Sequence, residues 1–263
     1  MTANENIKSN KMTTRAYDNR DGEAVKKNLS AGSRMKYSRW IGALFLAGFL
    51  TYGIGFGLVT SVIGAPDLLA AVSTQQTTLI LGAFLMLLNT VVDVGKGVLF
   101  FPILESHGKR TALTYLSALI VQVVMLDIGV LCLLMIAPLS QFTGQGWAEG
   151  LGSLLTQSNA MAYQIGQATL AFGGIFMTSL LYRTRLVPRP LAALGVIGYI
   201  VHVLGAIAEI FGIHISLVLL VPGMIFELAL PVWLIIKGFQ PEAYSGRAEA
   251  ATASDVRPAP AML

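Results

Sequence analysis

"LILGAFLMLLNTVVDVGKGVLFFPI", residues 79–103, is an almost unbroken apolar run in which only Asp93 and Lys96 carry a charge. A helix that rises about 1.5 Å per residue needs about 20 such residues to cross a hydrocarbon core of about 30 Å. This stretch is long enough to do so. We therefore expect it to form a transmembrane helix.

The rest of the chain has the same character. Hydrophobic residues make up 54% of it and charged residues only 12%, whereas about a quarter of the residues in a soluble domain are charged. We count six apolar blocks, at about 41–63, 79–103, 112–138, 162–182, 191–211 and 216–236. Their unbroken runs favour helices over the alternating strands of a membrane barrel. The predicted fold is an all-α polytopic membrane protein with six transmembrane helices.

The basic residues are distributed unevenly between the connections. Of the 18 Lys and Arg, nine precede the first block, and the others except Lys96 follow blocks two, four and six. The connections at 64–78, 139–161 and 212–215 contain none. Because Lys and Arg concentrate in cytoplasmic loops, we expect both termini to be cytoplasmic.

Composition divides the chain into three regions. Residues 1–39 are polar and basic and are expected to form a disordered tail, as are residues 240–263, while residues 40–239 form the six-helix domain. The first apolar block comes late and is too long for a cleavable signal, so we expect it to stay as the first helix. Met35, at the start of "MKYSRWIGALF", is an alternative translation start.

Three stretches carry a family resemblance: "FFPILESHGKRTALTYLSA" at 100–118, "LLYRTRLVPRPLAALGVIGY" at 180–199 and "IFELALPVWLIIKGF" at 225–239. Together they resemble the bacterial membrane family known as domain of unknown function 4386. The resemblance covers about residues 36–240. It implies six helices, in agreement with the count of apolar blocks, and a location in the bacterial inner (cytoplasmic) membrane.

Polar side chains fall at a similar depth in four of the predicted helices. Measured by helix rise, five of them lie about 10–16 Å from the cytoplasmic helix ends, and Asn89 shares one helix face with two of these. An ionisable side chain that faces lipid near mid-depth costs at least about 2.5 kcal/mol, so we expect the set to point into the bundle. This candidate polar layer consists of Asn89, Asp93, Lys96, Gln122, His202 and Glu227.

Two interpretations of the polar layer stay open. Asp93 and Lys96 either pair on one helix to specify packing, with Lys96 extending toward the headgroups, or form part of a substrate or proton site. Glu227 has no base on its own helix and is expected to contact Lys96, His202 or Gln122, or to be protonated. A second group, closer to the opposite surface, is expected to be partly interfacial: Asp127, Gln164, Gln167, Glu209 and His214.

Sequence patterns of common enzymes are not found. The chain has no GxxxxGK[ST] phosphate loop, no HExxH pair and no GxSxG turn. We expect no catalytic residues, cofactor or metal, and as partners the lipid bilayer and either a second copy or another membrane protein, but no nucleic acid. The leading hypothesis is a non-enzymatic membrane protein whose polar layer carries protons or a small solute. The alternatives are a structural or regulatory membrane subunit and an intramembrane enzyme that acts on lipid.

Overall fold

The computed structural model describes residues 31–240 as five long helices and one short 3₁₀ turn. No strand occurs in this part of the chain, which confirms the all-α prediction. The predicted tails at 1–30 and 241–263 lie outside the described residues, whereas residues 31–39, expected in the tail, already belong to the first described helix. The elements are α2 (Ala31–Ile63), α3 (Leu68–Leu139), η1 (Ser140–Phe142), α4 (Gly146–Thr184), α5 (Arg189–Ile210) and α6 (Ser216–Ile236).

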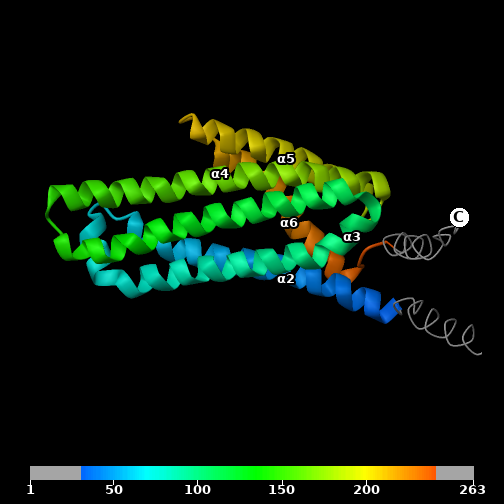
Figure 1. The fold of residues 1–263 in the computed structure, drawn as a ribbon, viewed down its shortest axis with the longest axis horizontal. Coiled ribbons are helices and arrows are strands. Elements are labelled where there is room, and N and C mark those ends of the chain that lie inside the picture. Colours follow the sequence, from blue (N-terminus) through cyan, green and yellow to red (C-terminus); the bar gives the residue numbers. More distant parts are fainter. Residues whose placement is uncertain (1–30, 241–263) are drawn as a thin grey trace, which may run out of the picture.

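Helix α3 reverses direction near its middle. The backbone leaves the helical region at Gly108, with φ −178° and ψ 86°, and Figure 1 shows the two halves running antiparallel. We call residues 68–107 the first arm and residues 109–139 the second arm. The arms pack closely, because a Cβ on Gly97 would lie 3.3 Å from side-chain atoms of Leu116 and Leu119. Apolar blocks two and three therefore lie one in each arm.

Five helices, with the folded α3 counted as one, are long and apolar enough to cross a membrane. They are Met35–Ile63, Leu68–Phe142, Gly146–Thr184, Arg189–Ile210 and Val218–Ile236. Large apolar side chains also cover much of the outer surface, among them Val91 at 68% exposure and Val218 at 71%. A soluble protein rarely exposes apolar side chains on this scale. The chain thus has the features of a multi-pass membrane protein.

The helices extend well beyond the predicted apolar blocks. Residues 64–78 and 139–161 were expected to be connections, but α3 begins at Leu68 and α4 begins at Gly146. Asp67 caps α3 by accepting a hydrogen bond from the Ala70 N–H at 3.0 Å. These helical turns did not appear as apolar blocks because only a narrow stripe of each is apolar, and the polar residues beside it lower the average hydropathy. The stripe includes the fully buried Leu69 and Ala148.

One half of the bundle consists of α2, the two arms of α3 and α4, and the other half contains α5 and α6 as well. One apolar core draws its buried residues only from α2, α3 and α4, with Val59, Leu79 and Leu133 among them. The other core adds residues of α5 and α6, such as Tyr199 and Phe226. Figure 1 shows why: α5 and α6 are shorter and lie along only one part of the long helices. The candidate polar layer is in the half that contains α5 and α6.

The start of α2 and the end of α6 meet at one end of the bundle, beside the α4–α5 turn. The Phe239 N–H donates to Ser38 Oγ at 3.3 Å, and the Gln240 N–H donates to the Leu186 carbonyl at 3.0 Å. The reversal of α3 at Gly108 lies at this end too (Figure 1). We call it the basic end, because it also gathers Lys36, Arg39, Lys109, Arg110, Arg183, Arg185, Arg189 and Lys237. The turns at the other ends of these helices are 64–67 and 140–145 at the far end of the bundle and 211–215 where the shorter α5 ends, and they contain no Lys or Arg.

Candidate functional site

A hydrogen-bonded group of three side chains lies on the first arm of α3. Lys96 Nζ donates to Asp93 Oδ1 at 2.6 Å, and Asn89 Nδ2 donates to the second carboxylate oxygen of Asp93 at 3.3 Å. The spacing of the residues explains the contacts, since side chains three and four positions apart are neighbours on a helix. Asp93 and Asn89 are buried, and the Lys96 side chain is only 12% exposed.

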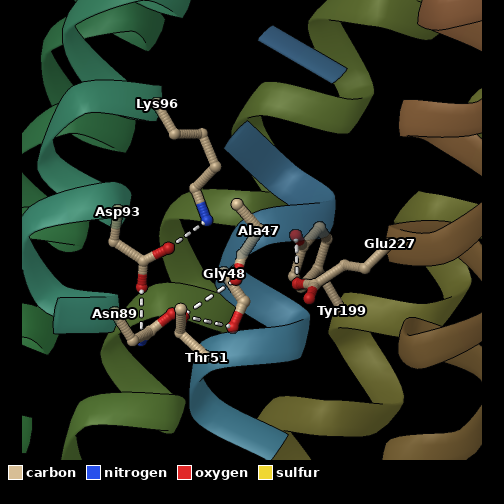
Figure 2. A network of polar contacts seen from close by, with 8 residues as sticks. All are labelled: Ala47, Gly48, Thr51, Asn89, Asp93, Lys96, Tyr199 and Glu227. Atoms are coloured by element: carbon tan, nitrogen blue, oxygen red, sulfur yellow. Dashed lines mark hydrogen bonds and ion pairs between the residues drawn. The ribbon is translucent and has the colours of Figure 1, made fainter. Parts of the chain in front are cut away.

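Lys96 reaches back along its own helix toward Asp93 (Figure 2). Its ammonium also lies 4.6 Å from the centre of the Phe45 ring on α2, where the ring face attracts a cation. Lys96 therefore does not extend toward the headgroups, as one of the two open interpretations of the pair had it. The ion pair and the aromatic ring hold the charge inside the bundle instead.

Helix α2 comes close to this group because it presents a glycine there. A Cβ on Gly48 would lie 3.1 Å from Asn89 Oδ1 and 3.4 Å from Asp93 Oδ1. One turn along, the Thr51 hydroxyl donates to the Ala47 carbonyl at 2.8 Å within its own helix. Gly48 thus closes one side of the polar group with backbone rather than with a side chain, as Figure 2 shows.

A second polar pair joins α5 to α6. The Tyr199 hydroxyl donates to Glu227 Oε1 at 2.7 Å, and the Tyr199 ring packs edge-on against Phe226 at 5.8 Å between centroids. Tyr199 is only 1% exposed, while Glu227 is half-buried. Figure 2 places this pair across α2 from the Asn89–Asp93–Lys96 group.

The two groups are coupled by charge. The Lys96 ammonium interacts electrostatically with Glu227 as well as with Asp93. Among the described residues, Lys96 forms its ion pair with Asp93, and Glu227 forms none. The site therefore holds two carboxylates and one ammonium, so one carboxylate lacks a matching base.

The structure places the other two predicted members of the polar layer differently. Gln122 lies on the second arm of α3 and is 4% exposed, but its Oε1 atom has no hydrogen-bond partner among the described residues. His202 is 7% exposed on α5 and faces α6, where its Nδ1 is 3.7 Å from the Cβ position of Gly223. Glu227 receives its hydrogen bond from Tyr199 and not from the expected Gln122 or His202.

Sequence reasoning missed the aromatic members of the site. Tyr199 precedes His202 by three positions on α5, so its place on the same helix face was a usable signal. Phe45 gave no such signal, because an apolar helix contains many aromatic residues and nothing local shows which of them will contact a charged group.

Three members of the group predicted near the opposite surface can be described in detail. His214, on the exposed α5–α6 turn, has its Nδ1 2.6 Å from Oε1 of Glu209 in the last turn of α5. Asp127 is half-buried on the second arm of α3, and its Oδ1 has no hydrogen-bond partner in the described part of the chain. No group of three metal-ligating side chains was found among the described residues.

Comparisons with known proteins identify a family without a described activity. Searches of curated proteins and of solved structures gave no match. The family model described as "Domain of unknown function (DUF4386)" matches residues 40–238, which include all five long helices almost completely. The chain therefore belongs to the DUF4386 family.

Proposed function

We propose that the chain crosses the membrane six times, with each arm of α3 crossing separately and the basic end in the cytoplasm. Each arm exceeds the length of about 20 residues that a crossing requires. The gathering of Lys and Arg at one end, against none in the opposite turns, supports this orientation. The membrane is the inner membrane of a bacterium in this proposal.

Reporter fusions test the orientation. A reporter that is active only outside the cytoplasm should be active after Gln145, in the turn between η1 and α4. The same reporter should be silent after Lys109, at the reversal of α3. The opposite pattern would refute the proposed orientation, and activity at both sites would refute the separate crossing of the two arms.

We further propose that the polar layer carries protons or a small cation across the membrane and that the protein is not an enzyme. The observation that carries this proposal is the unmatched carboxylate of Glu227. Asp93 is already paired with Lys96, whereas Glu227 has a tyrosine hydroxyl as its hydrogen-bond partner. An ionised carboxylate inside a membrane is costly, and binding a proton or cation offsets that cost. A residue that alternately binds and releases such a charge is the minimum that a carrier needs.

Proteoliposomes test the transport proposal. Purified protein in vesicles with an enclosed pH dye should dissipate an imposed pH gradient faster than protein-free vesicles. Glu227→Gln should reduce the flux to the protein-free level, because the amide cannot exchange a proton. Glu105→Gln is the matched control: this carboxylate is 40% exposed near the α3 reversal, 3.8 Å from Lys109, and its loss should leave the flux unchanged.

The experiment has two outcomes that oppose the proposal. If the unaltered protein gives no flux of protons or of tested monovalent cations, transport is refuted. If Glu227→Gln keeps its flux while remaining folded by circular dichroism, the role of this residue is refuted. The phospholipid profile of overexpressing cells should be unchanged, and a new lipid product would instead favour an enzyme.

A structural or regulatory subunit is the second candidate, and one observation favours it. The Asp93–Lys96 pair satisfies its own charges within a single helix, which is how a pair that serves only packing would look. In that case Asp93→Asn and Glu227→Gln should both lower stability, and neither these variants nor the unaltered protein should show flux.

A further inference from the structure

A shallow depression of about 270 Å³ opens at the basic end, on the first turns of α2. It is lined by Lys36, Arg39, Trp40 and Ala43. The depression lies where the apolar span Met35–Ile63 begins, so its mouth is at the level where lipid headgroups meet a spanning helix. It is separate from the polar layer and independent of the transport proposal.

Arg39 is held in place by the end of α6. Its Nε donates to the Ile235 carbonyl at 3.1 Å, one of the carbonyls that the last turn of a helix leaves without a helical partner. The contact fixes the guanidinium plane and leaves its two terminal amino groups for another acceptor. No carboxylate among the described residues forms an ion pair with Arg39 or Lys36.

The other lining residues suit a ligand that is polar at one end and apolar at the other. Trp40 is 66% exposed beside the two bases, and Ala43 lies one turn deeper along the same helix. Tryptophan favours the headgroup level of a membrane, where its ring contacts both polar and apolar groups. All four lining residues belong to α2, and the end of α6 borders them through the Arg39–Ile235 bond. In the proposed orientation this end is cytoplasmic, and basic residues at the cytoplasmic end of a membrane helix attract anionic lipid headgroups.

We propose that this depression binds the phosphate of an anionic phospholipid. Arg39 and Lys36 contact the phosphate oxygens, and Trp40 and Ala43 contact the glycerol and the upper acyl chains. The site differs from the general attraction of a basic surface, because Arg39 is oriented by Ile235 before any lipid arrives. Preorganisation of a donor lowers the entropic cost of binding.

Native mass spectrometry of the full chain in detergent, with phosphatidylglycerol or phosphatidylcholine added, tests the proposal. The unaltered protein should retain phosphatidylglycerol more strongly than phosphatidylcholine. Lys36→Gln should weaken phosphatidylglycerol binding about fivefold, as expected for one basic residue near a charged surface, and leave phosphatidylcholine binding unchanged. Arg39→Gln should weaken it further. Because Arg39→Gln also removes the bond to Ile235, Lys36→Gln is the variant that tests the ligand without disturbing a protein contact.

Lys109→Gln provides the matched control, since it removes one positive charge at the same end of the bundle. Lys109 is 72% exposed and lies 3.8 Å from Glu105, and its loss should leave lipid binding unchanged. If Lys109→Gln and Lys36→Gln weaken phosphatidylglycerol binding equally, the binding depends on surface charge alone and the proposed site is refuted. Release of the lipid by inorganic phosphate alone would assign the depression to a free anion, and this too would overturn the proposal.

Discussion

The Asp93–Lys96 pair supports a quantitative prediction about stability. Asp93→Asn keeps the shape of the side chain but leaves the Lys96 ammonium without its counter-charge. At 2.6 Å and an effective dielectric constant of about 20, the Coulomb attraction lost is about 6 kcal/mol. Part of this only offsets the cost of removing both groups from water, so we expect a net loss of about 3–5 kcal/mol in the free energy of unfolding.

The double variant separates a broken pair from a lost side chain. Lys96→Met removes the second charge and leaves an apolar side chain near the Phe45 ring. The loss in the free energy of unfolding of the double variant, Asp93→Asn with Lys96→Met, should therefore be about 2–3 kcal/mol smaller than the sum of the two single losses.

Equilibrium unfolding in mixed micelles provides the measurement. The fraction of denaturing detergent is raised while tryptophan fluorescence reports the folded state, and the three Trp residues of the chain supply the signal. Glu105→Gln is the control, because the Glu105–Lys109 pair is largely exposed and should contribute less than about 1 kcal/mol. If the two single losses add to within about 0.5 kcal/mol in the double variant, the pair is not coupled and the reasoning is wrong.

Three further substitutions follow from the packing of the bundle. Gly198→Leu should destabilise the fold by about 1–3 kcal/mol, because a Cβ there would lie 2.7 Å from Gly223 Cα. Gly53→Leu is its control and should be neutral in the same unfolding assay, because a Cβ at Gly53 would meet open space. Gln122→Leu should leave stability unchanged or raise it by about 1 kcal/mol, since it removes a buried oxygen without a partner, and a clear loss would show a missed contact. Tyr199→Phe should cost about 1.5–3 kcal/mol by removing its bond to a carboxylate on α6, and an unaltered unfolding midpoint would contradict this.

The sequence predicted which polar side chains are neighbours within one helix, but not which side chains contact each other between helices. Asn89, Asp93 and Lys96 are neighbours because they are three and four positions apart, a relation that any α-helix imposes. Glu227 was expected to contact Lys96, His202 or Gln122 or to be protonated, whereas its hydrogen bond comes from Tyr199 on another helix. Which residue lies opposite depends on how each helix is rotated about its axis.

Helix lengths show a second limit of sequence reasoning. The apolar blocks located all of the long helices, but the predicted connection at 139–161 is helical from Gly146 onward. Its small and polar residues lower the average hydropathy, while buried positions such as Ala148 and Gly152 keep an apolar contact with the first arm of α3. Packing against a neighbour extends a helix beyond the segment that lipid alone would select.

The sequence by itself determined the helical class, the membrane environment and the placement of the basic residues at alternate connections, because these depend only on local composition and chain order. The tertiary structure alone decided the lateral contacts: Phe45 against the Lys96 ammonium, Gly48 against Asp93 and the Tyr199–Glu227 bond between α5 and α6. Those contacts require specific helix rotations and close approaches. Such geometry arises from the packing of the whole bundle, and no single segment encodes it.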